Sequence, residues 1–413
     1  MKTILIVNMA NSSRKIHFEA ARCHGAKLIL LMKDPTWERE YVDKVVNIDT
    51  GNLKEVVEKV LELQKEEKVD GVIPFTEHSV PAAAAAATVL GVPFISNETA
   101  NIARNKHLMR KAFVKAGIPC PMFEIANDLL EAKKISANFK YPIVLKPLIG
   151  GGSLAVRRIN NENELEQYFD EIKNAALTKF EYDPLYEQTN KIYNGAILIE
   201  SYIPGGEVSV EGITVNGETT VLGIHDKRLP MEGPYFGEVY FTTPSILPQS
   251  VQEKLIYWTK KANEALNINM GATHTEFRIT DDENVVILET GARIGGGGTY
   301  KSILASTGID MVHSIMDISL GKVPDLTYEE SRPVARYNFF AEKEGIIKNI
   351  SGVEEVRADP SVIELLMYKK IGDKVSLPPN SIPHGHVIIR PKDLKNVDEH
   401  MKKIISKIII DVC

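Results

Sequence analysis

The sequence predicts an α/β protein in which a parallel sheet near the N-terminus is followed by partly antiparallel structure. Before residue 100, apolar runs of strand length recur at Ile4–Val7, Leu28–Met32 and Val72–Phe75, with helical patterns between them. After residue 200, Asn216–Gly217 stands between two β-rich runs, which is the sequence signal of a two-residue hairpin. We therefore expect a domain boundary near residue 100.

Local patterns predict the elements between these landmarks. Apolar residues at helical spacing from Leu53 to Leu61 predict a helix, and Pro81 stands in the first turn of another. Such alternation of strands and helices implies a parallel sheet that is covered on both faces. A basic helix is expected over residues 102–116, and a strand over 141–147. Near the C-terminus we expect strands over 334–340 and 386–389.

Length, charge and cysteine usage narrow the function. A chain of 413 residues is long enough for two or three domains. Its net charge of −6 argues against broad nucleic-acid binding, and no apolar stretch approaches the length of a membrane span. The three cysteines lie far apart without metal-ligand spacing, so we expect a cytoplasmic protein. A dinucleotide site is not expected, because the first glycine after the first strand is Gly25.

The most informative segment is a predicted hairpin that places two carboxylates opposite each other. Two β-rich runs here enclose four polar, turn-prone residues. If Thr280 pairs with Val285, then Glu276 faces Glu289 directly, with Cβ atoms about 4.5–5.5 Å apart. A magnesium ion would offset their repulsion, since it prefers oxygen ligands. The alternative is that Arg278, on the same face, bridges both glutamates.

A glycine-rich stretch follows the second glutamate. Arg293 offers a fork of donors suited to carboxylate or phosphoryl oxygens, and Gly295–Gly298 allows backbone to approach a ligand closely. The stretch is not a P-loop, because Tyr300 stands where a glycine must precede Lys301. This combination favours the magnesium interpretation of the two glutamates.

From Asp70 to about Gly321, the residues resemble the ATP-grasp superfamily, and within it the L-amino-acid (dipeptide) ligase-like members. Its motifs stand in the family's order: Asn105–Lys106, the strand ending in Lys146, Gly150–Ser153, Glu200–Glu207, and Glu276 with Glu289 and Arg293. The resemblance implies an ATP-grasp fold with a Rossmann-like N-terminal domain over 1–100. The ATP-grasp domain would cover 101–325, with a lid subdomain at about 112–203, and a C-terminal antiparallel extension would cover 326–413.

The resemblance also implies a role for each motif residue. Lys106 and Lys146 would contact ATP phosphates, under a loop containing Gly151, Gly152 and Ser153. The adenine hinge would comprise Glu200, Ser201, Tyr202 and Ile203, with Glu207 on the ribose hydroxyls. Glu276 and Glu289 would hold magnesium, or manganese in its place. Arg293 would stabilise the reacting intermediate, and His274 would lie near the substrates. The family often has asparagine where Gly291 stands, which is a departure.

The implied activity is ligation of a carboxylate to an amine through an acyl phosphate, with release of ADP and phosphate and with amino acids as expected substrates. Substrate contacts are expected at Glu77, Lys227, Glu238 and Gly295. We expect small-molecule partners, no nucleic acid and no membrane, and a homodimer stays open. The alternatives are an ATP-grasp enzyme that activates bicarbonate or formate, and an ATP-binding protein without catalysis.

Overall fold

The computed structural model describes residues 1–9, 11–296, 298–377 and 383–413. Its first sheet is parallel, as the sequence predicts, with the strand order β3-β2-β1-β4. The strands are β1 (Thr3–Val7), β2 (Lys27–Met32), β3 (Lys44–Asn47) and β4 (Gly71–Pro74). The sequence did not predict β3, which is four residues long and is half polar.

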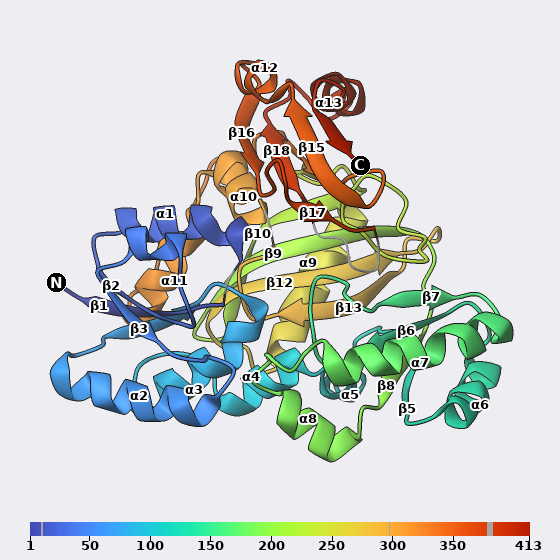
Figure 1. The fold of residues 1–413 in the computed structure, drawn as a ribbon, viewed down its shortest axis with the longest axis horizontal. Coiled ribbons are helices and arrows are strands. Elements are labelled where there is room, and N and C mark those ends of the chain that lie inside the picture. Colours follow the sequence, from blue (N-terminus) through green and yellow to red (C-terminus); the bar gives the residue numbers. More distant parts are fainter. Residues whose placement is uncertain (10, 297, 378–382) are drawn as a thin grey trace.

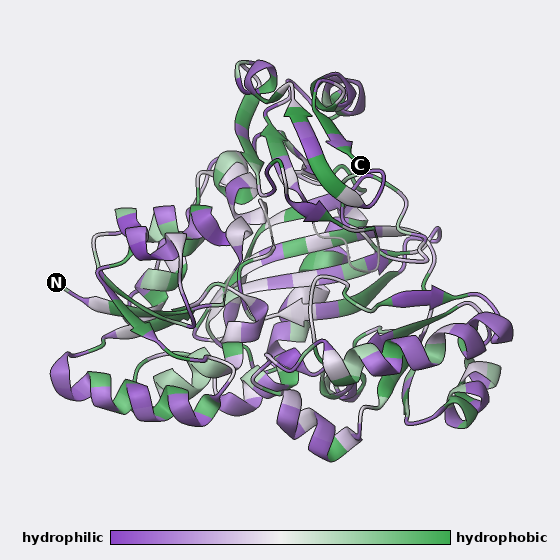
Figure 2. Cartoon of the chain, in the orientation of Figure 1, coloured by the Kyte–Doolittle hydropathy of each residue, from purple (hydrophilic) through white to green (hydrophobic). Residues whose placement is uncertain are grey.

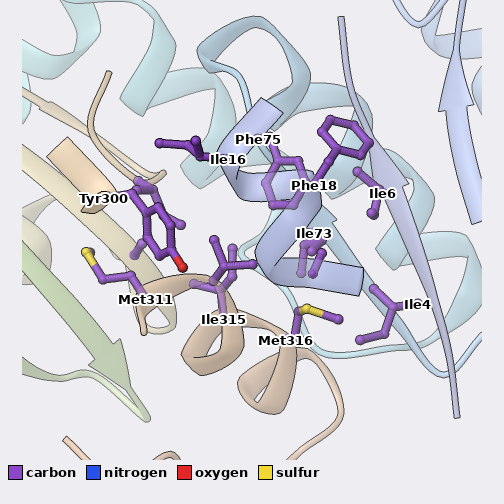
Figure 3. Close-up of a cluster of buried hydrophobic side chains, with 14 of the residues drawn as sticks. Ile4, Ile6, Ile16, Phe18, Ile73, Phe75, Tyr300, Met311, Ile315 and Met316 are labelled. Carbon is purple, nitrogen blue, oxygen red and sulfur yellow. The ribbon is translucent and has the colours of Figure 1, made fainter. Parts of the chain in front are cut away.

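Helices cover both faces of the parallel sheet (Figure 1). On one face, α2 (Leu53–Glu66) and α3 (Val80–Leu90) form an apolar cluster with alternate residues of the strands. The other face is covered by α1 (Lys15–Cys23) and by α11 (Met311–Ser319). Figure 3 shows this second cluster, in which Met311, Ile315 and Met316 of α11 lie against the strands. A helix from far downstream therefore completes the N-terminal core.

A second, antiparallel sheet lies between residues 123 and 201 and has the order β5-β8-β6-β7. Its strands are β5 (Phe123–Ala126), β6 (Ile143–Pro147), β7 (Arg157–Ile159) and β8 (Ile197–Ser201). The helices α6 (Leu129–Phe139) and α7 (Glu162–Thr178) share an apolar cluster with it, and α8 (Tyr186–Tyr193) precedes β8. Figure 2 shows apolar and polar residues alternating along these outer helices, as expected for helices with one buried face.

The largest sheet has eight strands in the order β13-β12-β9-β10-β11-β14-β18-β16. They are β9 (Gly206–Val215), β10 (Glu218–Lys227), β11 (Tyr240–Thr243), β12 (Gly271–Ile279), β13 (Val285–Gly291), β14 (Val334–Phe339), β16 (Val362–Met367) and β18 (Gly385–Ile389). The predicted hairpin is confirmed: Val215 pairs with Glu218, and both intervening residues, Asn216 and Gly217, have positive φ. The helix α9 (Gln249–Ala265) packs on this sheet, and α10 (Thr299–Thr307) follows β13.

The C-terminal residues add antiparallel structure, as predicted, and the structure places it in two sheets. β14, β18 and β16 extend the eight-stranded sheet, and β17 (Lys374–Val375), β15 (Gly345–Ser351) and β19 (Ile409–Val412) form a separate small sheet. The helices of this part are α12 (Val353–Arg357) and α13 (Val397–Ile405). No helix in the described ranges has the length and apolar character needed to cross a membrane.

The basic helix expected over 102–116 is two helices, α4 (Asn97–Arg104) and α5 (Lys106–Lys115). Asn105 has extended backbone, and its side-chain oxygen accepts hydrogen bonds from the amides of His107 and Leu108. It is therefore the N-cap of α5, which ends the first helix. The cap places Lys106 in the first turn of α5.

Candidate active site

Glu276 and Glu289 face each other across β12 and β13, as the sequence predicts. The predicted register at the turn is wrong, because Val285 pairs one residue earlier than expected, with Ile279. A β-bulge after Glu276 leaves Leu288 without a partner on β12. The extra residue in β13 brings the two glutamates into opposition after all.

Arg278 does not bridge these two glutamates, so the alternative interpretation of the pair is wrong. Its guanidinium donates to two backbone carbonyls and pairs with Glu207, whose Oε2 lies 3.0 Å from Nε. The side chains of Glu276 and Glu289 are 18% and 31% exposed. The pair therefore opens toward solvent without an arginine to neutralise both charges.

A buried lysine neutralises the other side of Glu276. The Nζ atom of Lys227 lies 3.2 Å from Glu276 and 2.5 Å from Glu238, and it also contacts Glu207. Oxygens of these three glutamates lie within 4.8 Å of one another, close enough to hold a metal ion. Burial alone would lower the pKa of Lys227, but the glutamates raise it well above its usual value. Lys227 and Glu238 are therefore paired with each other here, and their expected contacts with substrate stay a prediction.

One pocket brings most of the predicted nucleotide residues together. From the predicted set, its lining includes Lys106, Lys146, Gly151, Gly152, Ser153, Glu200, Ser201, Tyr202, Ile203, Glu207, Glu276 and Glu289. The lining comes from both the smaller antiparallel sheet and the eight-stranded sheet, so the pocket lies between them. Arg293, His274, Glu77 and Gly295 lie outside this lining.

The base of the pocket holds a buried ion-pair group centred on Glu200. Its carboxylate lies 2.5 Å from Nζ of Lys146 and 2.7 Å from Nε of Arg110. Burial alone would raise the pKa of Glu200, but Arg110 and Lys146 lower it. Burial lowers the pKa of Lys146 despite this partner. Glu200 is thus ionised, and it fixes Lys146 in the pocket wall.

Lys106 links two parts of the pocket. Its Nζ atom lies 3.7 Å from Oε2 of Glu289 and 3.4 Å from the carbonyl oxygen of Gly150. Its position follows from the Asn105 cap at the start of α5. Lys106 therefore places positive charge between the glutamate pair and the glycine loop.

The glycine loop needs the backbone freedom of its residues. Gly150 has φ of 125° and Gly152 has φ of 64°, and Ser153 adopts φ of 57°. A Cβ atom on Gly150 would lie 2.6 Å from the Phe180 ring. The carbonyl of Gly150 also accepts a hydrogen bond from Arg104 at 3.1 Å. The loop is therefore anchored at its first residue, while Gly151 and Gly152 line the pocket.

The predicted adenine hinge leaves β8 at the pocket edge. The amide of Ser201 donates to the carbonyl of Met122 at 2.9 Å, and the amide of Tyr202 to that of Pro142 at 3.3 Å. These amides hold the hinge to neighbouring strands. The adenine contacts that the resemblance implies for backbone groups of Ser201 and Ile203 stay a prediction.

Arg293 is held by a chain of ion pairs that reaches into the N-terminal part. Its Nε donates to Glu77, whose other oxygen lies 3.1 Å from Arg104, and Arg104 pairs with Asp183. Burial alone would raise the pKa of Glu77, but the two arginines lower it to about 2. Glu77 therefore orients Arg293, and its expected contact with a substrate ammonium group stays a prediction.

The same contact explains the glycine at 291. A Cβ atom there would lie 2.9 Å from Oε2 of Glu77 and 3.7 Å from the guanidinium of Arg293. The space that an asparagine side chain would need is thus already filled by the Glu77–Arg293 pair. The departure from the family pattern has a local packing cause.

His274 lies between two carboxylates. Its Nδ1 is 2.6 Å from Glu211 and its Nε2 is 3.4 Å from Glu276. Burial alone would lower the pKa of His274, but Glu211 raises it to about 10. The imidazole is therefore charged at neutral pH and carries no free lone pair to accept a proton. Gly295 lies against the Glu211–His274 pair, since a Cβ atom on Gly295 would come within 2.9 Å of both side chains. Gly297 of the same stretch lies outside the described residues.

Sequence reasoning gave no role to several residues of this site, and two of them carry a usable signal. Arg110 stands four residues after Lys106, on the same face of one helix. Glu211 stands four residues after Glu207 in one strand, so both side chains point to one face. Asp183 has no such signal, because its partner Arg104 is distant in sequence.

Comparisons with known proteins agree with this geometry. Residues 139–301 match the family model of the ATP-grasp domain, residues 18–94 the ATP-grasp N-terminal domain, and residues 338–412 the L-amino acid ligase C-terminal domain 2. The chain is 30% identical to alanine–anticapsin ligase of Bacillus subtilis (strain 168) over 66% of its own length and 59% of the relative's. It is 23% identical to an L-arginine-specific L-amino acid ligase of Bacillus subtilis, over 79% of this chain and 76% of that protein.

A solved structure shows the same fold. The crystal structure of L-amino acid ligase from Bacillus licheniformis superposes with a TM-score of 0.86 and 23% identity, over 100% of this chain and 99% of that one. The chain spans about three fifths of the length of the alanine–anticapsin ligase that it matches. Family models of the ATP-grasp N-terminal domain, the ATP-grasp domain and the L-amino acid ligase C-terminal domain 2 match its N-terminal, central and C-terminal parts in that order, so the chain is built of ATP-grasp domains and is similar to the L-amino acid ligases.

Proposed function

We propose that this chain is an ATP- and magnesium-dependent ligase that joins the carboxylate of one amino acid to the amine of another. The observation that carries the proposal is the opposition of Glu276 and Glu289 beside the pocket, with Lys106 at its edge. Two like charges directly opposite each other are destabilising; Lys227 and Lys106 offset part of this repulsion, and a cationic ligand held by both carboxylates would offset more of it. Two relatives, an alanine–anticapsin ligase and an L-arginine-specific L-amino acid ligase, support the same conclusion.

The residues present fit a magnesium ion. Glu276 and Glu289 both offer carboxylate oxygens, which are the ligands that Mg²⁺ prefers together with substrate phosphates. Among the described residues, the one ion-pair partner of Glu289 is Lys106, at 3.7 Å, so an oxygen of Glu289 is free to ligate. Bound there, Mg²⁺ would neutralise negative charge on the ATP phosphates.

Residues of the chain would bind the phosphates and stabilise the charge that develops in the reaction. The carboxylate of the first substrate would attack the γ-phosphate of ATP, giving ADP and an acyl phosphate. The amine of the second substrate would then attack the carbonyl carbon of this acyl phosphate, forming the amide bond and releasing phosphate and a proton. Lys106 and Lys146 would bind the phosphates, and Arg293, oriented by Glu77, would stabilise negative charge on the oxygen atoms of the reacting carboxyl group. Charged His274 would add positive charge near this centre and cannot remove the proton of the amine.

The test is phosphate release with ATP and Mg²⁺ over all pairs of amino acids, with mass spectrometry of the products. The proposal expects ADP, phosphate and a condensed product for some pairs. AMP and pyrophosphate would contradict the acyl-phosphate route. ADP release that depends on bicarbonate or formate without an amino acid would favour the other ATP-grasp activities, and ATP binding without turnover on any pair would favour a silent binding protein.

A matched pair of variants ties the activity to the site. Glu289→Gln should lose most of its phosphate release, because a neutral side chain is a weaker metal ligand. Glu283→Gln, in the exposed turn of the same hairpin, should behave as wild type. Equal activity of Glu289→Gln and Glu283→Gln would remove Glu289 from the site.

A further inference from the structure

Two buried arginines lie next to the proposed reaction centre without a carboxylate partner. The residues are Arg14, 4% exposed, and Arg336, 3% exposed. Among the described residues, neither arginine forms an ion pair with a carboxylate, and the Nε atom of each is buried without a hydrogen bond. The guanidinium of Arg336 lies over the ring of Phe241, 4.0 Å from its centroid, which does not neutralise its charge. Charged groups that are buried in proteins are almost always paired, so this arrangement requires an explanation.

The two guanidinium groups hold the same segment of backbone. Nη1 of Arg14 donates to the carbonyl of Gly295 at 2.8 Å, and Nη1 of Arg336 donates to the carbonyl of Gly296 at 3.2 Å. These carbonyls belong to consecutive residues that follow Arg293 almost directly. Arg14 comes from the N-terminal part and Arg336 from β14, so the two arginines approach this segment from different parts of the fold.

The carboxylates nearest to this pair are already engaged. Glu211 lies 2.6 Å from charged His274, and Glu77 contacts Arg293 and Arg104. Burial and the neighbouring charge of Arg293 together lower the pKa of Arg14 to about 9. The pair therefore keeps positive charge at neutral pH that no described side chain neutralises directly.

We propose that Arg14 and Arg336 form a subsite for the free carboxylate of the amine-bearing substrate. This inference rests on the proposed function and names the class of acceptor: an amino acid rather than a simple amine. The phosphates of ATP are not the anion in question, because neither arginine lines the nucleotide pocket. The carboxylate of the first substrate is consumed in the reaction, whereas an amino-acid acceptor keeps its own.

The first experiment compares acceptors on the wild-type protein. Each amino acid that supports phosphate release is paired with its own α-amide, which keeps the amine and the side chain but lacks the charge. We expect kcat/KM to fall about ten- to hundred-fold for the amide, as for loss of one or two hydrogen bonds to charged groups. Equal kcat/KM for acid and amide would overturn the subsite. Absence of any product with any amino acid would instead overturn the proposed function.

The second experiment asks whether these arginines cause the discrimination. In Arg14→Met and Arg336→Met, the preference for acid over amide should shrink about tenfold, with a higher KM for the acid and little change for the amide. Arg22→Met, an exposed arginine that pairs with Asp43, is the control and should keep the wild-type preference.

A structural role for the arginines gives a different result. If they only support the Gly295–Gly296 backbone, each Met variant should lose activity with acid and amide acceptors to the same extent, and this outcome would overturn the proposal. Arg14→Lys and Arg336→Lys keep the positive charge and serve as controls for misfolding of the Met variants. They should retain part of the preference for the acid over the amide acceptor. Lys variants that fold but show no preference at all would also contradict the subsite.

Discussion

Replacing Glu77 by glutamine tests the ion-pair chain that holds Arg293. Burial alone would raise the pKa of Glu77, but Arg293 and Arg104 lower it from 4.5 to about 2. At 1.36 kcal/mol per pKa unit, this shift corresponds to about 3 kcal/mol of folding stability. Glutamine keeps the shape of the side chain without its charge, so we expect Glu77→Gln to be less stable by about 3 kcal/mol at neutral pH.

The pH dependence identifies the cause. Because folding lowers the pKa of Glu77, its ionised form stabilises the protein above pH 4.5, and this stabilisation is lost as the pH falls toward about 2. Urea unfolding of wild type and variant should therefore differ by the full amount near pH 7 and by about half of it near pH 3. Glu62→Gln, an exposed glutamate paired with Lys59, should show no measurable change. A Glu77→Gln deficit that is absent, or that stays constant with pH, would refute the reasoning.

Three other expectations concern the metal, the histidine and the loop. Glu289→Gln should weaken Mn²⁺ binding in the presence of ADP about tenfold or more by electron paramagnetic resonance, and unchanged affinity would contradict its role as a ligand. Glu211 raises the pKa of His274 to about 10. The contribution of protonated His274 to folding stability should therefore be fully present below pH 6.5 and lost as the pH rises through about 10. An NMR titration that finds the pKa of His274 near 6.5 would contradict this. Gly150→Ala should raise the KM for ATP and lower the free energy of unfolding by about 1–3 kcal/mol, because φ of Gly150 is 125° and a Cβ atom there would contact Phe180. A KM and an unfolding free energy equal to those of the wild type would exclude strain at this residue.

The sequence predicted the helices and strands of the fold better than their boundaries and their pairing register. The parallel sheet, its helical cover and the Asn216–Gly217 hairpin follow from periodicity and turn chemistry, which are local. The break between α4 and α5 was missed, although Asn105 is a good N-cap, because helical periodicity continues across it. The predicted register of β12 and β13 was wrong at the turn, because the bulge at Leu288 leaves no signal in the local sequence pattern.

The candidate site shows the same difference between residues in local motifs and contacts between distant segments. Residues that line the pocket, such as Lys146 and Glu200, stand in motifs that the sequence displays in order. The partners that set their charge come from distant segments, and only the folded chain brings them together. Arg14 and Arg336 are the extreme case, since their shared contact with one short backbone segment depends on the packing of the whole molecule.

The helix α11 has a practical consequence for anyone who wishes to express the N-terminal hundred residues alone. Its side chains Met311, Ile315 and Met316 cover one face of the parallel sheet, where Ile4 and Ile73 are almost fully buried. A fragment that stops at residue 100 would present this apolar face to water, and such faces drive aggregation. Recombinant work on the first hundred residues should therefore supply α11 as a fused or added peptide, and recovery of soluble fragment should depend on its presence.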